Sequence, residues 1–190
     1  MSFSISQNLS DKIFNLIKYI NIFKSKKTIS IIFSMGEIDI RNIYYQMLIL
    51  EKKFRNENDL SKFIATNFVR SYENIYYKLK KKNILNIKFY FLEIPPVTIK
   101  KFYLPKNLKQ LEKIRLKNKF PIIGSLNQRI KWRNNLSKNL ESICKKNHIN
   151  FLKLDKKNFD SKGGAINKLK SIDLGHISDV NLISSLQTKI

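Results

Sequence analysis

Residues 28–41, TISIIFSMGEIDIR, decide the fold class of this chain. The first six are β-branched or apolar except for one serine, which predicts a strand covered on both faces of a parallel sheet. The stretch then changes character, because a glycine, two acids and a base follow the strand: Gly36, Glu37, Asp39 and Arg41. In open α/β sheets, ligands bind at this carboxyl edge of the strands. The stretch therefore predicts a strand that leads into a candidate binding site.

A plainer interpretation of the same residues involves no ligand. Gly36 permits a tight turn, and Glu37 and Asp39 cap the helix that follows, since acids are common in a first helical turn. Both interpretations stay open at the level of the sequence.

Two further strands are predicted in the chain, and helical patterns separate all three. We expect parallel strands near residues 28–35, 84–93 and 149–154. Apolar residues recur at helical spacing in four other segments: 10–23, 42–54, 58–82 and 125–146. Strands that alternate with helices predict parallel crossovers, so the expected fold is a layered α/β structure. At 190 residues the chain suits one domain, spanning residues 1–190.

The helix that follows Gly124 and Ser125 has the clearest apolar face in the chain. Arg129, Arg133 and several lysines occupy its other positions. We interpret these basic residues as a solvated face of the helix.

The formal charge of +23 is the strongest compositional signal. Taken alone, it indicates a partner such as nucleic acid or an anionic membrane surface. However, most of the 37 basic residues are lysines and only six are arginines, in a chain also rich in Ile and Asn. An A- and T-rich genome encodes such residues by default, whereas proteins that bind phosphate and bases favour arginine's bidentate fork. We therefore favour compositional drift, and we expect only nonspecific, salt-dependent binding to polyanions.

The remaining composition limits the cofactors and the location. The single cysteine, Cys144, excludes an intrachain disulfide and a cysteine-based zinc cluster, and we expect neither a metal nor a cofactor. Polar residues interrupt every apolar stretch near the N-terminus, and no apolar run approaches the roughly 20 residues of a transmembrane helix. The sequence therefore indicates a cytoplasmic protein without a membrane span.

A second polar constellation lies near the C-terminus, where Asp173 and His176 are three residues apart. A catalytic histidine needs an acceptor that holds its tautomer and stabilises its charged form, and an aspartate one turn away can provide it. The same spacing also arises by chance, and a capping aspartate beside a surface histidine is the simpler interpretation.

The order of these features resembles the SGNH (GDSL-type) hydrolase superfamily, in particular the GEID-bearing members that look like surface-polysaccharide biosynthesis proteins. The resemblance rests on short motifs in a fixed order: GEID and Arg41 after one strand, Pro95 and Pro96 after the next, Gly124 with Arg129 at a helix start, and Asp173 with His176 before the last helix. It covers about residue 28 to the C-terminus, and its specificity comes from that order.

The resemblance implies a flavodoxin-like, three-layer fold and the hydrolysis or transfer of an ester-linked acyl group on a saccharide. His176 would be the general base, Asp173 would orient it, and the backbone amide of Gly36 would help to hold the oxyanion. We expect Gly36 and His176 at the same edge of the sheet. The candidates for substrate binding are Glu37, Asp39, Arg41 and Arg129. Arg41 either meets an anionic substrate or pairs with one of the acids.

The chain departs from the family pattern in two places. Ile38 stands where the common pattern has an asparagine, so a side-chain donor to the oxyanion is missing. The Gly-Asp-Ser block that supplies the nucleophile does not occur, and Ser34 is poorly placed to replace it. We therefore expect an N-terminally truncated SGNH-like domain that lacks its first strand and is inactive alone. The alternative is a basic nucleic-acid-binding or ribosome-associated protein.

Overall fold

A computed structural model describes residues 15, 16, 19, 29–81, 87–97, 102–118 and 121–154. Within these ranges the chain forms a parallel sheet of three strands in the order β1-β2-β3. The strands are β1 (Ile29–Phe33), β2 (Ile87–Leu92) and β3 (Asn150–Leu152). All three predicted strands are confirmed, although each is shorter than the apolar stretch that predicted it. The fold is therefore α/β, with helices packed on a parallel sheet.

The sheet register places aromatic side chains from neighbouring strands on one face. Phe33 pairs with Phe91 across β1 and β2, and Phe91 pairs with Phe151 across β2 and β3. The rings of Phe33 and Phe91 lie 5.4 Å apart, and Tyr72 contacts the ring of Phe89 edge-on at 5.3 Å. This aromatic face is the floor of the main core.

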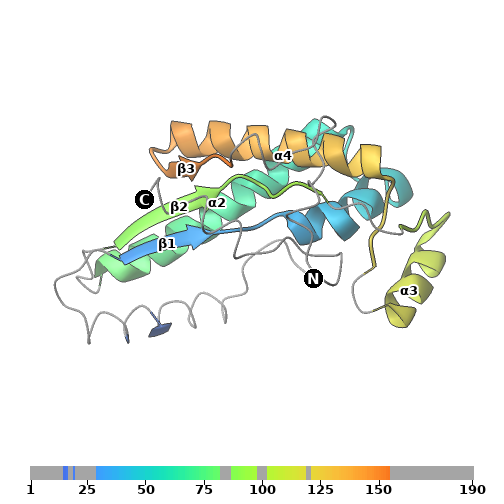
Figure 1. Cartoon of the computed structure of the whole chain (residues 1–190), viewed down its shortest axis with the longest axis horizontal. Helices are drawn as coiled ribbons and strands as arrows, with labels where there is room; N and C mark the ends of the chain where they lie inside the picture. Colours follow the sequence, from blue (N-terminus) through green and yellow to red (C-terminus); the bar gives the residue numbers. More distant parts are fainter. Residues whose placement is uncertain are drawn as a thin grey trace.

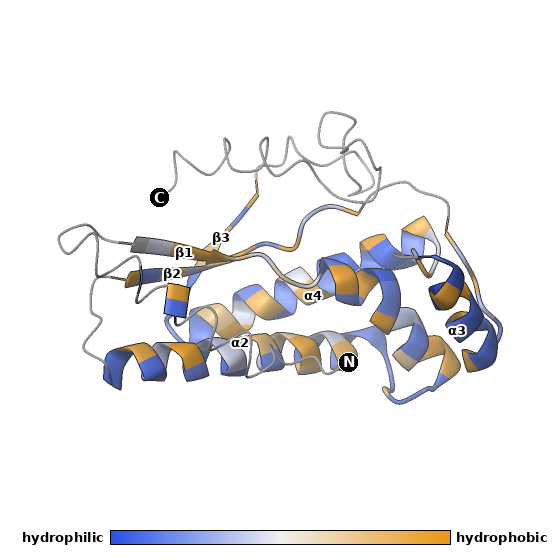
Figure 2. Cartoon of the chain, turned by 90° about the horizontal axis from the view of Figure 1, so that it is seen from below, coloured by the Kyte–Doolittle hydropathy of each residue, from blue (hydrophilic) through white to orange (hydrophobic). Residues whose placement is uncertain are grey.

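Two long helices cover this face side by side (Figure 1, Figure 2). Helix α2 (Glu57–Lys81) begins where the side chain of Asn56 accepts hydrogen bonds from the backbone amides of Asn58 and Asp59, so Asn56 caps the helix. Helix α4 (Leu126–Lys146) begins with a capping box between Ser125 and Gln128. Both helices follow the apolar periodicity that predicted them.

A second, smaller apolar cluster lies on the opposite face of the sheet. It consists of Tyr90, Leu92, Leu152 and Leu154, all of them buried. Alternation along the strands places these side chains away from Phe89, Phe91 and Phe151. A flavodoxin-like, three-layer arrangement requires helices over both faces, and it stays a prediction for this second face.

The segment after β1 turns helical earlier than the sequence predicted. Helical backbone begins at Glu37 instead of residue 42, and it includes two π-helical turns, η1 (Asp39–Ile43) and η2 (Gln46–Leu50). Apolar residues at helical spacing predicted the helix only from residue 42, because the polar residues of GEID obscure the pattern before it. The amide of Ile40 already donates to the carbonyl of Gly36 at 3.0 Å, so the helix begins directly at the end of the strand.

A shorter helix, α3 (Leu108–Lys117), interrupts the connection between β2 and α4. The side chain of its N-cap, Asn107, accepts a hydrogen bond from the amide of Gln110 at 2.9 Å. Within the described ranges, no helix is both long and apolar enough to cross a bilayer.

Candidate functional site

Gly36 occupies the carboxyl end of β1, at a place that admits no side chain. Its φ of 95° lies in the left-handed region, and the residue is buried. A Cβ at this position would come within 2.8 Å of Ile94 Cδ1 and 2.9 Å of Leu136 Cδ2. The end of β2 and helix α4 thus close on the backbone of Gly36, so glycine is required for conformation and for space.

Glu37 and Arg41 form an ion pair on the first turns of the following helix. Arg41 Nη1 lies 3.1 Å from Glu37 Oε1, and the arginine side chain is buried while the glutamate is partly exposed. Two roles were predicted for Arg41, and in the structure it pairs with an acid, Glu37. The pair fixes the helix start beside Gly36.

Arg129 reaches the same place from the first turns of α4. Only 1% of Arg129 is exposed, and its Nε donates to the carbonyl of Gly124 at 3.1 Å. Burial and, to a smaller extent, the charge of Arg41 lower the pKa of Arg129 to about 10, a net effect that the charge of Glu37 partly offsets. The structure therefore brings Arg129 into electrostatic reach of the Glu37–Arg41 pair. We call Gly36, Glu37, Arg41 and Arg129 the edge cluster.

The predicted solvated face of α4 is wrong for its two arginines. Arg129 and Arg133 are both buried, whereas Lys131 between them is exposed. The reason is helical spacing: positions 129 and 133 fall on the same stripe as the core residues Leu136 and Leu140. The sequence signal that could have revealed this is the residue type, because arginine is rare in this lysine-rich chain.

Arg133 also joins three parts of the fold. Its Nε donates to the carbonyl of Ile94 at 2.8 Å, and its Nη2 forms an ion pair with Glu93 Oε1 at 2.8 Å. The other carboxylate oxygen of Glu93 accepts from the amide of Leu154 at 2.9 Å. Sequence reasoning missed Glu93, which follows β2 at the same edge where Gly36 follows β1.

Asp39 lies in the first turn of the helix, and its environment disfavours its charged form. Burial, opposed by a hydrogen bond from its own backbone and reinforced by the nearby charge of Glu37, raises the pKa of Asp39 from 3.8 to about 6. Asp39 also raises the pKa of Tyr44, although the larger cause there is burial. Asp39 is thus an acid whose protonation changes near neutral pH beside the edge cluster.

Gly124 forms the other wall of the site. Its φ is 91°, and a Cβ there would lie 2.9 Å from the ring of Trp132, which stacks on Tyr44 at 5.5 Å. Just before it, the amide of Ile123 donates to the carbonyl of Arg41 at 2.7 Å. The glycine that opens α4 is therefore held against the helix that follows β1.

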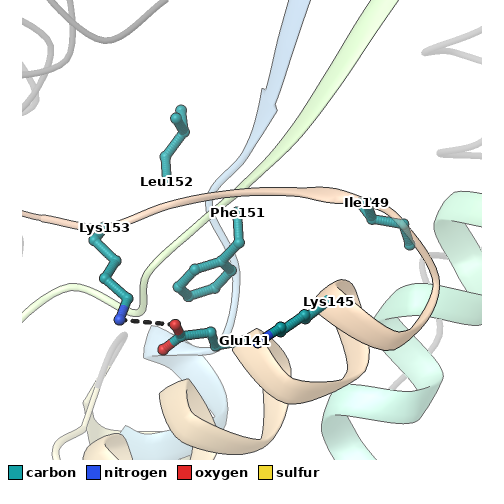
Figure 3. Close-up of a pocket in the computed structure, with 6 residues that line it drawn as sticks. All are labelled: Glu141, Lys145, Ile149, Phe151, Leu152 and Lys153. Atoms are coloured by element: carbon teal, nitrogen blue, oxygen red, sulfur yellow. Dashed lines mark ion pairs between the residues drawn. The ribbon is translucent and has the colours of Figure 1, made fainter.

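A shallow cavity of about 430 Å³ lies elsewhere, between the C-terminal part of α4 and β3. Figure 3 shows its lining: Glu141, Lys145, Ile149, Phe151, Leu152 and Lys153, with Lys153 Nζ paired to Glu141 Oε1 at 2.7 Å. Glu141 follows Arg129 by more than three turns of α4, roughly 18 Å along its axis. None of the predicted site residues that the structure describes lines this cavity.

The other predicted site residues have different outcomes. Asp173 and His176 lie outside the described residues, so their pairing and their position relative to Gly36 stay predictions. Ile38, at the position of the missing asparagine, is 68% exposed and contributes no polar group. Ser34 is exposed at the end of β1.

No family model matches the chain, and no curated protein matches it.

Proposed function

We propose that this chain is an SGNH-hydrolase-like domain, related to the hydrolysis or transfer of ester-linked acyl groups on surface saccharides. The observation that supports this best is the edge cluster. A buried glycine with positive φ ends the first strand of a parallel sheet, and an ion pair and a second arginine from a distant helix fix the backbone around it. Such a rigid backbone is what an oxyanion site requires.

In this proposal each group has a separate task. His176 is the general base, Asp173 holds its tautomer, and the amide of Gly36 donates to the oxyanion. Because Arg41 is paired with Glu37, the two residues position the helix start instead of binding substrate. Arg129 ties α4 to the same point through the carbonyl of Gly124.

The proposal includes inactivity of the 190-residue chain by itself. The chain contains no Gly-Asp-Ser block, and a general base and an oxyanion donor accelerate acyl transfer only when a nucleophile lies within hydrogen-bond reach. We expect no hydrolysis of short p-nitrophenyl esters above background. The assay compares the purified chain with His176→Ala and with His148→Ala, since any exposed imidazole hydrolyses such esters slowly. Turnover that depends on His176 and not on His148 would contradict this part of the proposal, with Ser34 the first nucleophile to test.

A distance measurement tests the family assignment independently of activity. We expect a spin label at Ser178→Cys to lie nearer to one at Ile38→Cys than to one at Lys81→Cys. Residue 38 marks the carboxyl edge, and α2 returns the chain to the amino edge, so the two positions are separated by about the 17 Å length of a strand. If the label at position 178 lies nearer to position 81, His176 is at the wrong edge and the assignment fails.

The nucleic-acid alternative receives less support from the described residues. Arg41, Arg129 and Arg133, three of the six arginines, are buried within the fold. Guanidinium groups in these positions cannot reach phosphates or bases, and the accessible charge is mainly lysine.

A further inference from the structure

Helix α3 stands apart from α2 and α4, beyond the carboxyl ends of the strands (Figure 1, Figure 2). One side attaches it to the fold. Leu111 is buried there, and Arg115 Nη2 donates to Asn42 Oδ1 at 2.6 Å and to Gln46 Oε1 at 2.7 Å. These contacts with the helix after β1 fix which side of α3 faces outward. We call residues 102–118 the α3 arm.

The outward side of α3 combines lysines with an exposed leucine. At about 100° per residue, Lys109, Lys113 and Leu116 fall within roughly 60° of one another, opposite Leu111. Leu116 is 87% exposed, more than any other large apolar side chain among the described residues. Among the described residues, none covers this leucine to any large extent.

Further apolar side chains are exposed at the other end of the arm: Phe102, Leu104 and Leu108. Cations surround them, because Lys106, Lys109, Lys113 and Lys117 are all exposed and Glu112 is the only acid in the arm. Large apolar groups among lysines are the composition of helices that lie in a membrane interface.

We propose that the α3 arm docks on the surface of an anionic lipid bilayer. Leu116, Leu108, Leu104 and Phe102 enter the boundary between headgroups and acyl chains, while the lysine stems extend to the lipid phosphates. Arg115 keeps its hydrogen bonds to Asn42 and Gln46, so the fold need not change on docking.

The apolar groups favour a bilayer over nucleic acid. A phosphodiester backbone is bound by cations and hydrogen-bond donors, and exposed leucines gain nothing from it. The only arginine in the arm, Arg115, faces inward, so the group best suited to phosphate and base edges is not presented. A lipid interface uses both the lysines and the leucines.

The test is co-sedimentation of the full chain with vesicles of phosphatidylcholine, with and without phosphatidylglycerol. We expect binding only to the anionic vesicles, and weaker binding as salt increases. Changing Lys109, Lys113 and Lys117 to Gln should weaken it on the order of fivefold per lysine. Leu116→Ser should weaken vesicle binding roughly tenfold, because binding then no longer transfers a leucine side chain from water into the bilayer.

Matched variants separate the arm from the general positive charge. Lys62, Lys80 and Lys138 are exposed on α2 and α4, and changing all three to Gln removes the same charge from the molecule. Tyr77→Ser removes an exposed apolar group from α2. Both controls should retain vesicle binding. If the control lysines matter as much as those of α3, or if neutral vesicles bind equally well, the proposal is wrong.

A dye at position 116 and an RNA-binding assay distinguish a lipid bilayer from nucleic acid as the partner of the α3 arm. Cys144 is buried, and burial raises the pKa of its thiol to about 12, so a thiol introduced by Leu116→Cys takes an environment-sensitive dye selectively. Anionic vesicles should shift its emission to the blue, and a poly(U) RNA should not. Binding to poly(U) that needs the α3 lysines but not Leu116, without any vesicle binding, would overturn the lipid proposal in favour of nucleic acid.

Discussion

The edge cluster and the α3 arm are neighbours that use positive charge in opposite ways. In the edge cluster, Arg41 and Arg129 are buried, and Glu37 and a backbone carbonyl receive their donors. In the arm, the lysines are exposed around apolar side chains. The net charge of the chain therefore does not show which basic residues hold the fold together and which lie on its surface. Planar guanidinium groups, which make several directed hydrogen bonds, fix the backbone, whereas ammonium groups on flexible stems cover the outside.

The largest difference between the two regions is expected when a side chain is added at Gly36 in the edge cluster. Gly36→Ala should destabilise the fold by about 4 kcal/mol, because it combines a left-handed φ with contacts to Ile94 and Leu136 that are too short. Urea unfolding at neutral pH measures the change. Lys113→Ala in the arm is the comparison variant and should change stability by less than about 0.5 kcal/mol. Equal effects at the two positions would remove the distinction between the regions.

The next largest effect concerns a buried arginine beside the edge cluster. Arg133→Ala should cost about 3 kcal/mol, since it removes the arginine that donates to Glu93 Oε1 and to the carbonyl of Ile94. Arg133→Lys keeps the charge but not the fork, and should recover only part of the loss. The matched control on the same helix is Lys131→Ala, whose ion pair with Glu57 is exposed and should contribute less than about 1 kcal/mol. Unfolding midpoints that fall equally for positions 131 and 133 would contradict the prediction.

The smallest expected effect depends on pH. Because the folded state raises the pKa of Asp39 to about 6, that state binds the proton more tightly than the unfolded chain does. The stabilisation from Asp39 is therefore fully present below about pH 4 and is lost as pH rises through about 6. Asp39→Asn should flatten this part of the stability profile, and Asp59→Asn on α2, in an exposed position, should leave it unchanged. A profile of the Asp39→Asn variant that parallels the natural chain would show that Asp39 ionises normally.

The sequence was a good guide wherever one periodicity dominated. Alternating or continuous apolar residues predicted all three strands, and the spacing of Leu60, Ile64 and Phe68 predicted α2. The sequence was a poor guide where a polar residue had a buried role. Arg129 and Arg133 lie on the apolar stripe of α4, and only their partners at the strand ends, far away in sequence, make that burial possible. Such pairings cannot be seen from spacing alone.

The GEID segment also depends on contacts that cannot be predicted from the spacing of its residues. The plainer interpretation of Gly36 and its acids agrees with the structure, since the glycine has a left-handed φ and Glu37 and Asp39 lie in the first helical turn, whereas a binding site at this edge stays a prediction. The sequence did not predict which acid would pair with Arg41, or that Leu136 of α4 would pack against Gly36. Asp173 and His176 lie outside the described residues, so the catalytic half of the predicted site rests on the sequence alone.

The π-helical turns after β1 let this helix carry extra residues without turning its later part away from the core. Ile40, Arg41, Tyr44 and Tyr45 are all buried, although a regular α-helix would place Arg41 and Tyr45 about 100° or more from Ile40. A π turn holds about one residue more than an α turn, so neighbouring side chains are closer in angle and more of them can face one side. Deletion of a single residue from η1 should therefore convert that turn to α-helix and leave the later residues facing the same way relative to β1, whereas a further insertion would rotate them by about a quarter turn. This segment should thus tolerate a shortening better than a lengthening.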